Sequence, residues 1–133
     1  MDQSTEPTTF NVLFQDEHLV VVEKPSGWAV HPGWAPRERS MLAPLSKQLE
    51  RYLYPAHRLD QGTSGAVLFT FDKSSARLMA EQFQARRVDK RYLALVRGQP
   101  KLAQGFIDHA IPRTKGGERV PAQTSWRRLA CID

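Results

Sequence analysis

The residues best suited to chemistry lie in one short segment, from His57 to Gly65, directly before the apolar run 66–71. Within nine residues the segment supplies an imidazole, a guanidinium, a carboxylate, two hydroxyl groups and two glycines. Loops held by a rigid scaffold are where such groups can face a ligand. A plain turn is the other interpretation, in which the two glycines take positive φ and Asp60 caps the turn.

The sequence offers little for metal binding, disulfide formation or glycoside hydrolysis. Cys131 is the only cysteine, which excludes an internal disulfide and a thiolate metal cluster, and the four histidines are scattered without ligand spacing. We therefore expect no metal. A carboxylate-based hydrolase would need a second carboxylate within about 5–10 Å of Asp60, and the segment 57–65 offers none.

The bulk composition is typical of one globular domain. The chain has 133 residues, of which 41% are hydrophobic and 25% charged, so disordered and fibrous classes are excluded. It contains no apolar run of about 18 residues and no leader of the secretory type. We expect a cytoplasmic protein without a membrane segment, with a flexible leader over residues 1–9 and a folded part over residues 10–133.

The charge distribution favours a polyanionic partner. The net charge is +5, and Lys and Arg gain affinity for phosphates by releasing condensed counterions. The basic residues gather in two regions, one with Arg86, Arg87, Lys90, Arg91 and Arg97, the other with Arg113, Lys115, Arg119, Arg127 and Arg128. For any one of Arg86, Arg87, Lys90 and Arg91, a solvated charged face is an equally good interpretation.

The elements that would position the segment 57–65 follow from hydrophobic periodicity and turn residues. Apolar runs predict strands over residues 10–14, 19–23, 28–30, 66–71, 90–98, 105–111 and 122–129. Helical spacing predicts one helix from 41 to about 52, capped by Ser40, and another ending at about 86, capped by Asp72 or Ser74. The first two strands would form a hairpin, and residues 66–98 a strand–helix–strand crossover. The fold class is α+β, with a mixed, largely antiparallel sheet, helices packed on it and a basic cleft across it.

Three motifs in a fixed order carry a resemblance to a known family. They are Lys24-Pro25-Ser26-Gly27, then His57-Arg58-Leu59-Asp60 followed by Thr63-Ser64-Gly65, and then Lys90-Arg91-Tyr92-Leu93-Ala94-Leu95-Val96. Together they resemble the RluA-type pseudouridine synthases, and the similarity extends from about Asn11 to the end. The stretch 14–31 is similar to the branch of that family that modifies uridine 65 of tRNA.

The resemblance implies an isomerase that converts uridine in RNA to pseudouridine without a cofactor. Asp60 would be the nucleophile at the sugar C1′ or would assist formation of a glycal intermediate, since a carboxylate suits either role. Tyr92 would stack on the extruded uracil and serve as general base. The expected partner is RNA, with tRNA preferred and rRNA as the alternative, and no obligate protein partner is expected.

Further residues are assigned to RNA contacts by the same resemblance. Arg58 would touch the RNA backbone or fill the gap left by the flipped nucleotide. His57 would either hold the loop or touch a phosphate. The remaining expected phosphate contacts are Arg86, Arg87, Lys90 and Arg91.

The resemblance also predicts what this sequence lacks. The family continues beyond the matched part with further strands and a basic motif that pairs with the catalytic carboxylate, and nothing here matches that motif. We expect the N-terminal part of a catalytic domain, without the small S4 domain that some relatives carry. A catalytically inactive, RNA-binding remnant is the alternative function.

Overall fold

The computed structural model describes residues 9–33 and 39–131. It divides the chain into two compact units, Met1–Lys90 and Arg91–Asp133. The predicted leader lies almost entirely outside the described residues. No helix among the described residues is long and apolar enough to cross a membrane.

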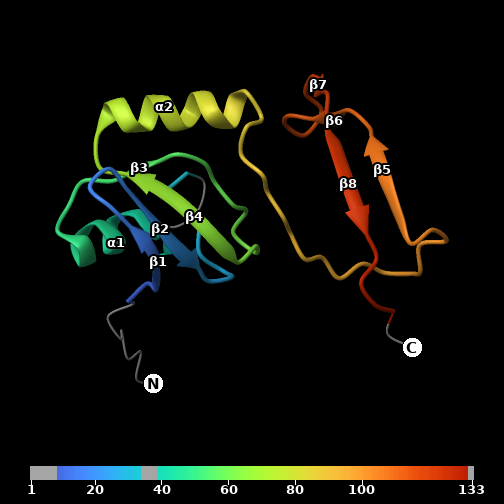
Figure 1. Cartoon of the computed structure of the whole chain (residues 1–133), viewed down its shortest axis with the longest axis horizontal. Helices are drawn as coiled ribbons and strands as arrows, with labels where there is room; N and C mark the ends of the chain where they lie inside the picture. The colour runs from blue at the N-terminus through green and yellow to red at the C-terminus, as the bar shows by residue number, and fades with distance from the viewer. Residues whose placement is uncertain (1–8, 34–38, 132–133) are drawn as a thin grey trace. The chain divides into compact units, whose positions relative to one another are not determined.

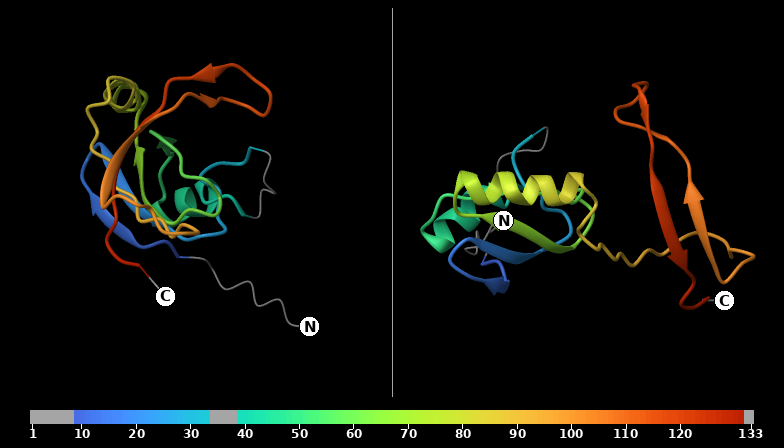
Figure 2. Two further views of the ribbon diagram at one scale, coloured as in Figure 1. Left: turned by 90° about the vertical axis from the view of Figure 1, so that its right-hand side faces the viewer. Right: turned by 45° about the horizontal axis from the view of Figure 1, so that its top comes forward.

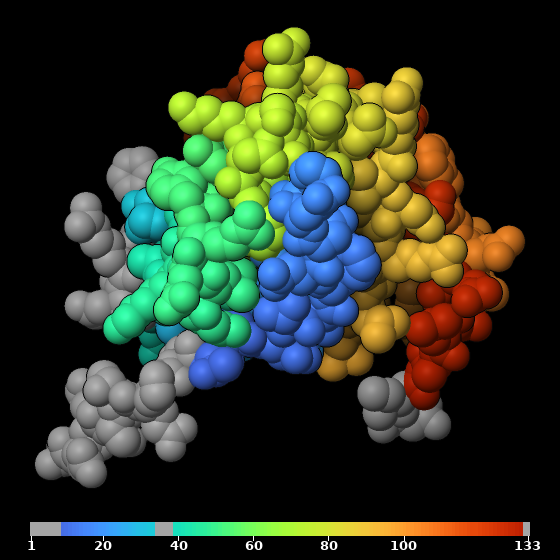
Figure 3. All heavy atoms as spheres, turned by 60° about the vertical axis from the view of Figure 1, so that its left-hand side comes forward, coloured from blue at the N-terminus to red at the C-terminus, as the bar shows by residue number. Residues whose placement is uncertain are grey.

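A four-stranded antiparallel sheet forms the centre of the first unit (Figure 1), with the order β1-β2-β4-β3. The strands are β1 Val12–Gln15, β2 Leu19–Lys24, β3 Tyr54–Pro55 and β4 Gly65–Thr70. The predicted hairpin is confirmed as β1–β2, and β2 pairs with β4 along its whole length. The edge strand β1 has all four residues exposed and forms part of the molecular surface beside α1 (Figure 3).

One face of this sheet carries the hydrophobic core. Val20 and Val22 of β2 lie opposite Phe69 and Val67 of β4, and all four side chains are fully buried. The β-branched run of β2 explains this placement, because every second side chain of a strand points to the same face. The remaining core residues come from the surrounding segments and are Phe10, Val30, Met41, Leu45, Leu53 and Leu59.

Helix α1, Leu42–Leu49, packs Leu45 into this core, but Ser40 is not its cap. The helix begins after Met41, whose side chain makes no capping hydrogen bond. Ser40 instead lies beside Ala29, because the Ala29 backbone bonds to both Arg39 and Met41 and holds this segment extended. The helix also ends earlier than expected, at Leu49, and the next residue, Glu50, takes a left-handed φ of 52°.

Helix α2, Lys73–Gln84, confirms the prediction for its start. The Asp72 side chain accepts a hydrogen bond from the Ser75 N–H, which satisfies one of the free donors of the first turn. Its carboxylate also accepts from the Ser74 and Ser75 hydroxyl groups, and these bonds lower the pKa of Asp72. The helix runs beside β3 and β4 without a fully buried residue (Figure 1).

The strand predicted over residues 90–98 is absent from the described structure, and with it the crossover. Residues 89–96 belong to no helix or strand. A strand needs a hydrogen-bonded neighbour, and the described chain supplies none for Tyr92–Val96. The large apolar side chains here are consequently exposed, by 87% for Leu93 and 90% for Leu95.

The second unit consists of paired strands (Figure 2). Strand β5, Gln104–Asp108, pairs antiparallel with β8, Gln123–Arg127, and β6, Ile111–Pro112, pairs with β7, Arg119–Val120. Strands β5 and β8 confirm predicted strand positions, the predicted run 105–111 is divided between β5 and β6, and β7 was not predicted. The predicted loop 114–118 lies between β6 and β7. None of the described residues 91–131 is buried. The α+β class with antiparallel sheets is confirmed.

Candidate active site

The segment 57–65 connects β3 to β4 and is held by the turn that follows β2. The Gly27 N–H donates to the Gln61 carbonyl oxygen at 2.8 Å, and the Gln61 side-chain amide donates to the Gly27 carbonyl oxygen at 3.0 Å. The Ser26 hydroxyl donates to the Gly62 carbonyl oxygen at 2.8 Å. Two of the three sequence motifs are therefore bound to each other, and Gly27 takes a φ of 88° at the junction.

Lys24 lies beneath this junction and is fully buried. Its Nζ donates to the carbonyl oxygens of Pro25 and Gln61, both at 3.1 Å, and to that of Trp28. An ammonium has three N–H donors, so every donor is paired. Burial lowers the pKa of Lys24, and the negative charge of Asp60 opposes this shift.

Asp60 is exposed between two anchored residues. Leu59 before it is buried in the core, and Gln61 after it is bound by Lys24 and Gly27. The Asp60 carbonyl oxygen accepts from the Thr63 N–H at 3.0 Å, which closes a turn. The backbone is thus fixed on both sides of a carboxylate that faces solvent, as a nucleophile for a large substrate requires.

The His57 side chain is half-buried, and its ring contacts other residues of the protein. Its Nε2 accepts a hydrogen bond from the Leu68 N–H of β4 at 3.1 Å, and its ring stacks on Phe83 of α2 with the centroids 4.7 Å apart. Burial lowers the pKa of His57, the charge of Lys90 lowers it further, and a hydrogen bond with the Arg58 backbone opposes the shift. These contacts favour the loop-holding role over the phosphate contact.

The other predicted RNA contacts are exposed in two different units. Arg58 lies beside Asp60, and Arg86, Arg87 and Lys90 follow the end of α2 in the first unit. Arg86 takes a left-handed φ of 54° there. Arg91 and Tyr92 belong to the second unit, and Tyr92 is 60% exposed. The pairing of Tyr92 with Asp60 stays a prediction.

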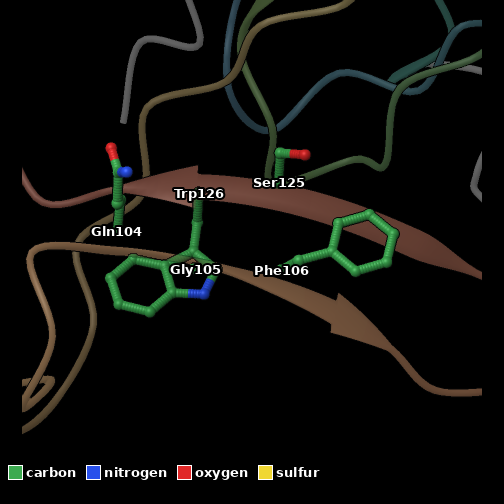
Figure 4. Close-up of a pocket in the computed structure, with 5 residues that line it drawn as sticks. All are labelled: Gln104, Gly105, Phe106, Ser125 and Trp126. Atoms are coloured by element: carbon green, nitrogen blue, oxygen red, sulfur yellow. The ribbon is translucent and has the colours of Figure 1, made fainter.

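A pocket on the β5–β8 hairpin lacks the groups for catalysis. It is lined by Gln104, Gly105, Phe106, Ser125 and Trp126, none of which ionises in the ordinary range (Figure 4). The Trp126 indole lies against Gly105, where an added Cβ would come within 2.7 Å of the ring. The glycine therefore serves the packing of the tryptophan. No group of side chains suited to hold a metal occurs among residues 9–33 and 39–131.

Sequence reasoning placed Lys24–Gly27 in a motif and Gln61 in the segment 57–65, but it did not predict the hydrogen bonds that join Lys24, Ser26 and Gly27 to that segment. A signal for Lys24 was present, because it follows Val20 and Val22 at a spacing of two and so shares their buried face. No comparable signal existed for Gln61, whose partner Gly27 is 34 positions away.

Comparison with known proteins identifies the family. The sequence profile described as RNA pseudouridylate synthase matches residues 18–130. The tRNA pseudouridine synthase C of Pectobacterium carotovorum subsp. carotovorum is 40% identical over 106 residues, which cover 78% of this chain and 28% of the relative. The protein of the same name from Salmonella typhi is 39% identical over 134 residues, which cover 92% of this chain and 51% of the relative.

Two solved human structures share the fold. Human RNA Pseudouridylate Synthase Domain Containing 1 matches with a TM-score of 0.73 and 22% identity, over 93% of this chain and 54% of that structure. Human RNA Pseudouridylate Synthase Domain Containing 4 matches with a TM-score of 0.65 and 27% identity, over 86% of this chain and 50% of that structure.

The chain spans about half of these structures, 28% of one bacterial relative and 51% of the other. The matched profile nevertheless covers most of the chain and includes all three motifs. The chain therefore belongs to the RluA-type RNA pseudouridylate synthase family.

Proposed function

We propose that this chain carries the nucleophile of an RNA pseudouridine synthase that acts on tRNA. The observation that supports this most directly is the exposed Asp60 carboxylate on a backbone fixed by buried Leu59 on one side and by Gln61 on the other. The tRNA substrate is proposed because the relatives are named tRNA pseudouridine synthase C. A site of the uridine 65 type is the specific target, with rRNA as the alternative substrate.

The reaction exchanges one glycosidic bond for another without net redox change. Asp60 attacks the sugar C1′ and displaces uracil through its N1, which takes up a proton. The uracil turns, and its C5 attacks C1′ and releases the carboxylate. Tyr92 accepts the C5 proton, which is lost to solvent. In the glycal variant Asp60 instead assists removal of the proton at C2′ as uracil leaves, which forms a C1′–C2′ double bond. The uracil C5 then bonds to C1′ while C2′ takes a proton back, and Tyr92 again accepts the C5 proton.

The exposed basic residues would hold the RNA while the base is extruded. Extrusion costs a few kcal/mol, which contacts to the flanking backbone offset. Arg58 is suited to the gap left by the flipped nucleotide because it is exposed beside Asp60. Arg86, Arg87, Lys90 and Arg91 would bind phosphates, and His57 would hold the loop that carries Asp60.

The Asp60→Asn variant tests this assignment, because asparagine keeps the shape of the side chain and removes its nucleophilic oxygen. We expect pseudouridine, measured by nucleoside analysis of digested tRNA, to fall below detection. The dissociation constant for tRNA, measured by filter binding, should change less than about twofold. Pseudouridine formation by the variant would remove Asp60 from the mechanism.

A non-catalytic RNA-binding remnant is the second candidate. It is favoured because the chain spans only 28% and 51% of the two bacterial relatives. This candidate predicts tRNA binding by the wild-type chain but no pseudouridine. A full-length tRNA pseudouridine synthase C in a parallel reaction shows that the tRNA is a competent substrate, so the two candidates give different results.

A further inference from the structure

Lys24 is a charged residue in a place where charge is rarely found. It ends strand β2 on the face that carries Val20 and Val22, and its side chain is fully buried. An ammonium is tolerated in a protein interior only when its donors are hydrogen-bonded. A hydrophobic side chain would fill the same space at lower cost, so the charge calls for a reason beyond packing.

The acceptors of Lys24 come from two segments that are distant in sequence. The Pro25 and Trp28 carbonyl oxygens belong to the turn after β2, and the Gln61 carbonyl oxygen belongs to the segment 57–65. The same Gln61 oxygen also accepts the Gly27 N–H. The ammonium therefore binds three backbone carbonyl groups at once and links the two motifs.

Lys24 and Asp60 are also related through charge, because the negative charge of Asp60 raises the pKa of Lys24 against the effect of burial. All three Lys24 donors go to carbonyl oxygens. No described residue donates a hydrogen bond to the Asp60 carboxylate, so its oxygens stay available to a substrate. A buried cation whose position is already fixed interacts more strongly with a nearby charge than a cation in water does.

We propose that Lys24 is a positioning residue that holds the Asp60 carboxylate in its reactive place by anchoring the Gln61 carbonyl from beneath. Its catalytic consequence rests on the proposed role of Asp60 as nucleophile. The structural part stands on the contacts of Lys24 alone, so the two can fail separately.

Hydrogen exchange in the full chain tests the structural part. Lys24→Met removes the charge and the donors but keeps the length of the side chain. We expect exchange of the Gly27 and Thr63 amides to accelerate at least about tenfold more than that of the β2–β4 amides. The matched control Val22→Ala, which only opens space in the same strand, should accelerate all of these amides alike. Equal acceleration in Lys24→Met would overturn the proposal.

Restoring the ammonium distinguishes positioning from simple packing. In a Cys131→Ser background, Lys24→Cys can be aminoethylated while unfolded and then refolded, which rebuilds a lysine-like side chain. We expect this product to regain slow exchange at Gly27 and Thr63, while the product of propylation, of similar size and uncharged, does not. Equal recovery with both groups would overturn the proposal, because shape alone would then suffice.

Kinetics test the catalytic part. Because Lys24 is buried, Lys24→Met should lower kcat at least about tenfold and leave the dissociation constant for tRNA unchanged. A loss of tRNA binding with kcat unchanged would contradict positioning. If the wild-type chain forms no pseudouridine, the proposed function fails, and hydrogen exchange still decides the role of Lys24.

Discussion

Leu59, Gln61 and Gly65 restrict the backbone around Asp60 in three different ways. Leu59 anchors it by burial, Gln61 by hydrogen bonds to Lys24 and Gly27, and Gly65 by a φ of 138° that turns the chain into β4. Each constraint acts within a few residues of the carboxylate. The backbone around Asp60 therefore depends on local geometry that is in place without a ligand.

His57 makes the stability of the protein depend on pH. The folded state lowers its pKa below the value of about 6.5 found in unfolded chains. The unfolded state therefore binds more protons than the folded state as the pH falls below about 6.5. The contribution of His57 to the stability of the fold is complete above that pH and is lost as the pH falls below it. Protonation would also remove the lone pair that accepts the Leu68 N–H.

Thermal unfolding measures this effect. We expect the wild-type melting temperature to fall between about pH 7.5 and pH 5.5. The His57→Gln variant should fall less, because glutamine does not titrate while its side-chain oxygen can still accept from Leu68. His18, His31 and His109 are common to both proteins and cancel in the comparison. Equal decreases would show that folding does not lower the pKa of His57.

At the scale of elements, the entry into β4 depends on a glycine. A side chain at Gly65 would have room, since its Cβ would lie 3.7 Å from the Leu59 side chain. The backbone conformation is the obstacle, because a φ of 138° is strained for any residue with a Cβ. Strain at this position would be transmitted directly to the segment that carries Asp60.

Gly65→Ala should therefore lower the free energy of unfolding by about 1–3 kcal/mol, measured by urea denaturation. Gly62→Ala is the matched control, because an added Cβ there meets nothing within 4 Å and no positive φ is required. We expect the control to stay within about 0.5 kcal/mol of the wild type. Two variants of equal stability would contradict the strain argument.

The elements also show where sequence reasoning succeeds and where it fails. The β1–β2 hairpin, β4 and the Asp72 cap were predictable because apolar runs and capping side chains act locally. Ser40 was expected to cap α1, but its segment pairs with Ala29 instead. Such competition between a cap and a distant backbone partner leaves no trace in the local sequence.

In the candidate site, residue types and spacing singled out the segment that carries His57, Arg58 and Asp60, and the roles of these residues stay predictions. The junction between Gly27 and Gln61 was not predicted, because it joins residues 34 positions apart. Residues 90–98 have the apolar pattern of a strand, yet the described chain gives them no partner strand. The pattern alone therefore predicted a strand that the described residues do not form.

At the scale of the whole molecule, the second unit exposes much apolar surface. Tyr92, Leu93, Leu95 and Val96 are each at least 60% exposed, and no described residue of this unit is buried. Unpaired extended segments and apolar patches promote association between chains. We therefore expect the wild-type chain to self-associate at micromolar concentration.

The double variant Leu93→Ser/Leu95→Ser tests the origin of this association by sedimentation velocity at several concentrations. It should shift the distribution toward monomer. Leu78→Ser, which removes a leucine of 59% exposure from α2, is the control and should leave the distribution unchanged. A wild-type chain that sediments as a single monomeric species at all concentrations would refute the expectation.

Tritium release from tRNA labelled at C5 of uridine is the most direct test of Asp60 as nucleophile, because every pseudouridine formed displaces that hydrogen. The wild-type chain, Asp60→Asn and a full-length tRNA pseudouridine synthase C are compared on the same unmodified tRNA. We expect release by the wild-type chain and the full-length enzyme, and none by Asp60→Asn. Release by the full-length enzyme alone would show that this chain does not catalyse the reaction, and release by Asp60→Asn would show that Asp60 is not the nucleophile.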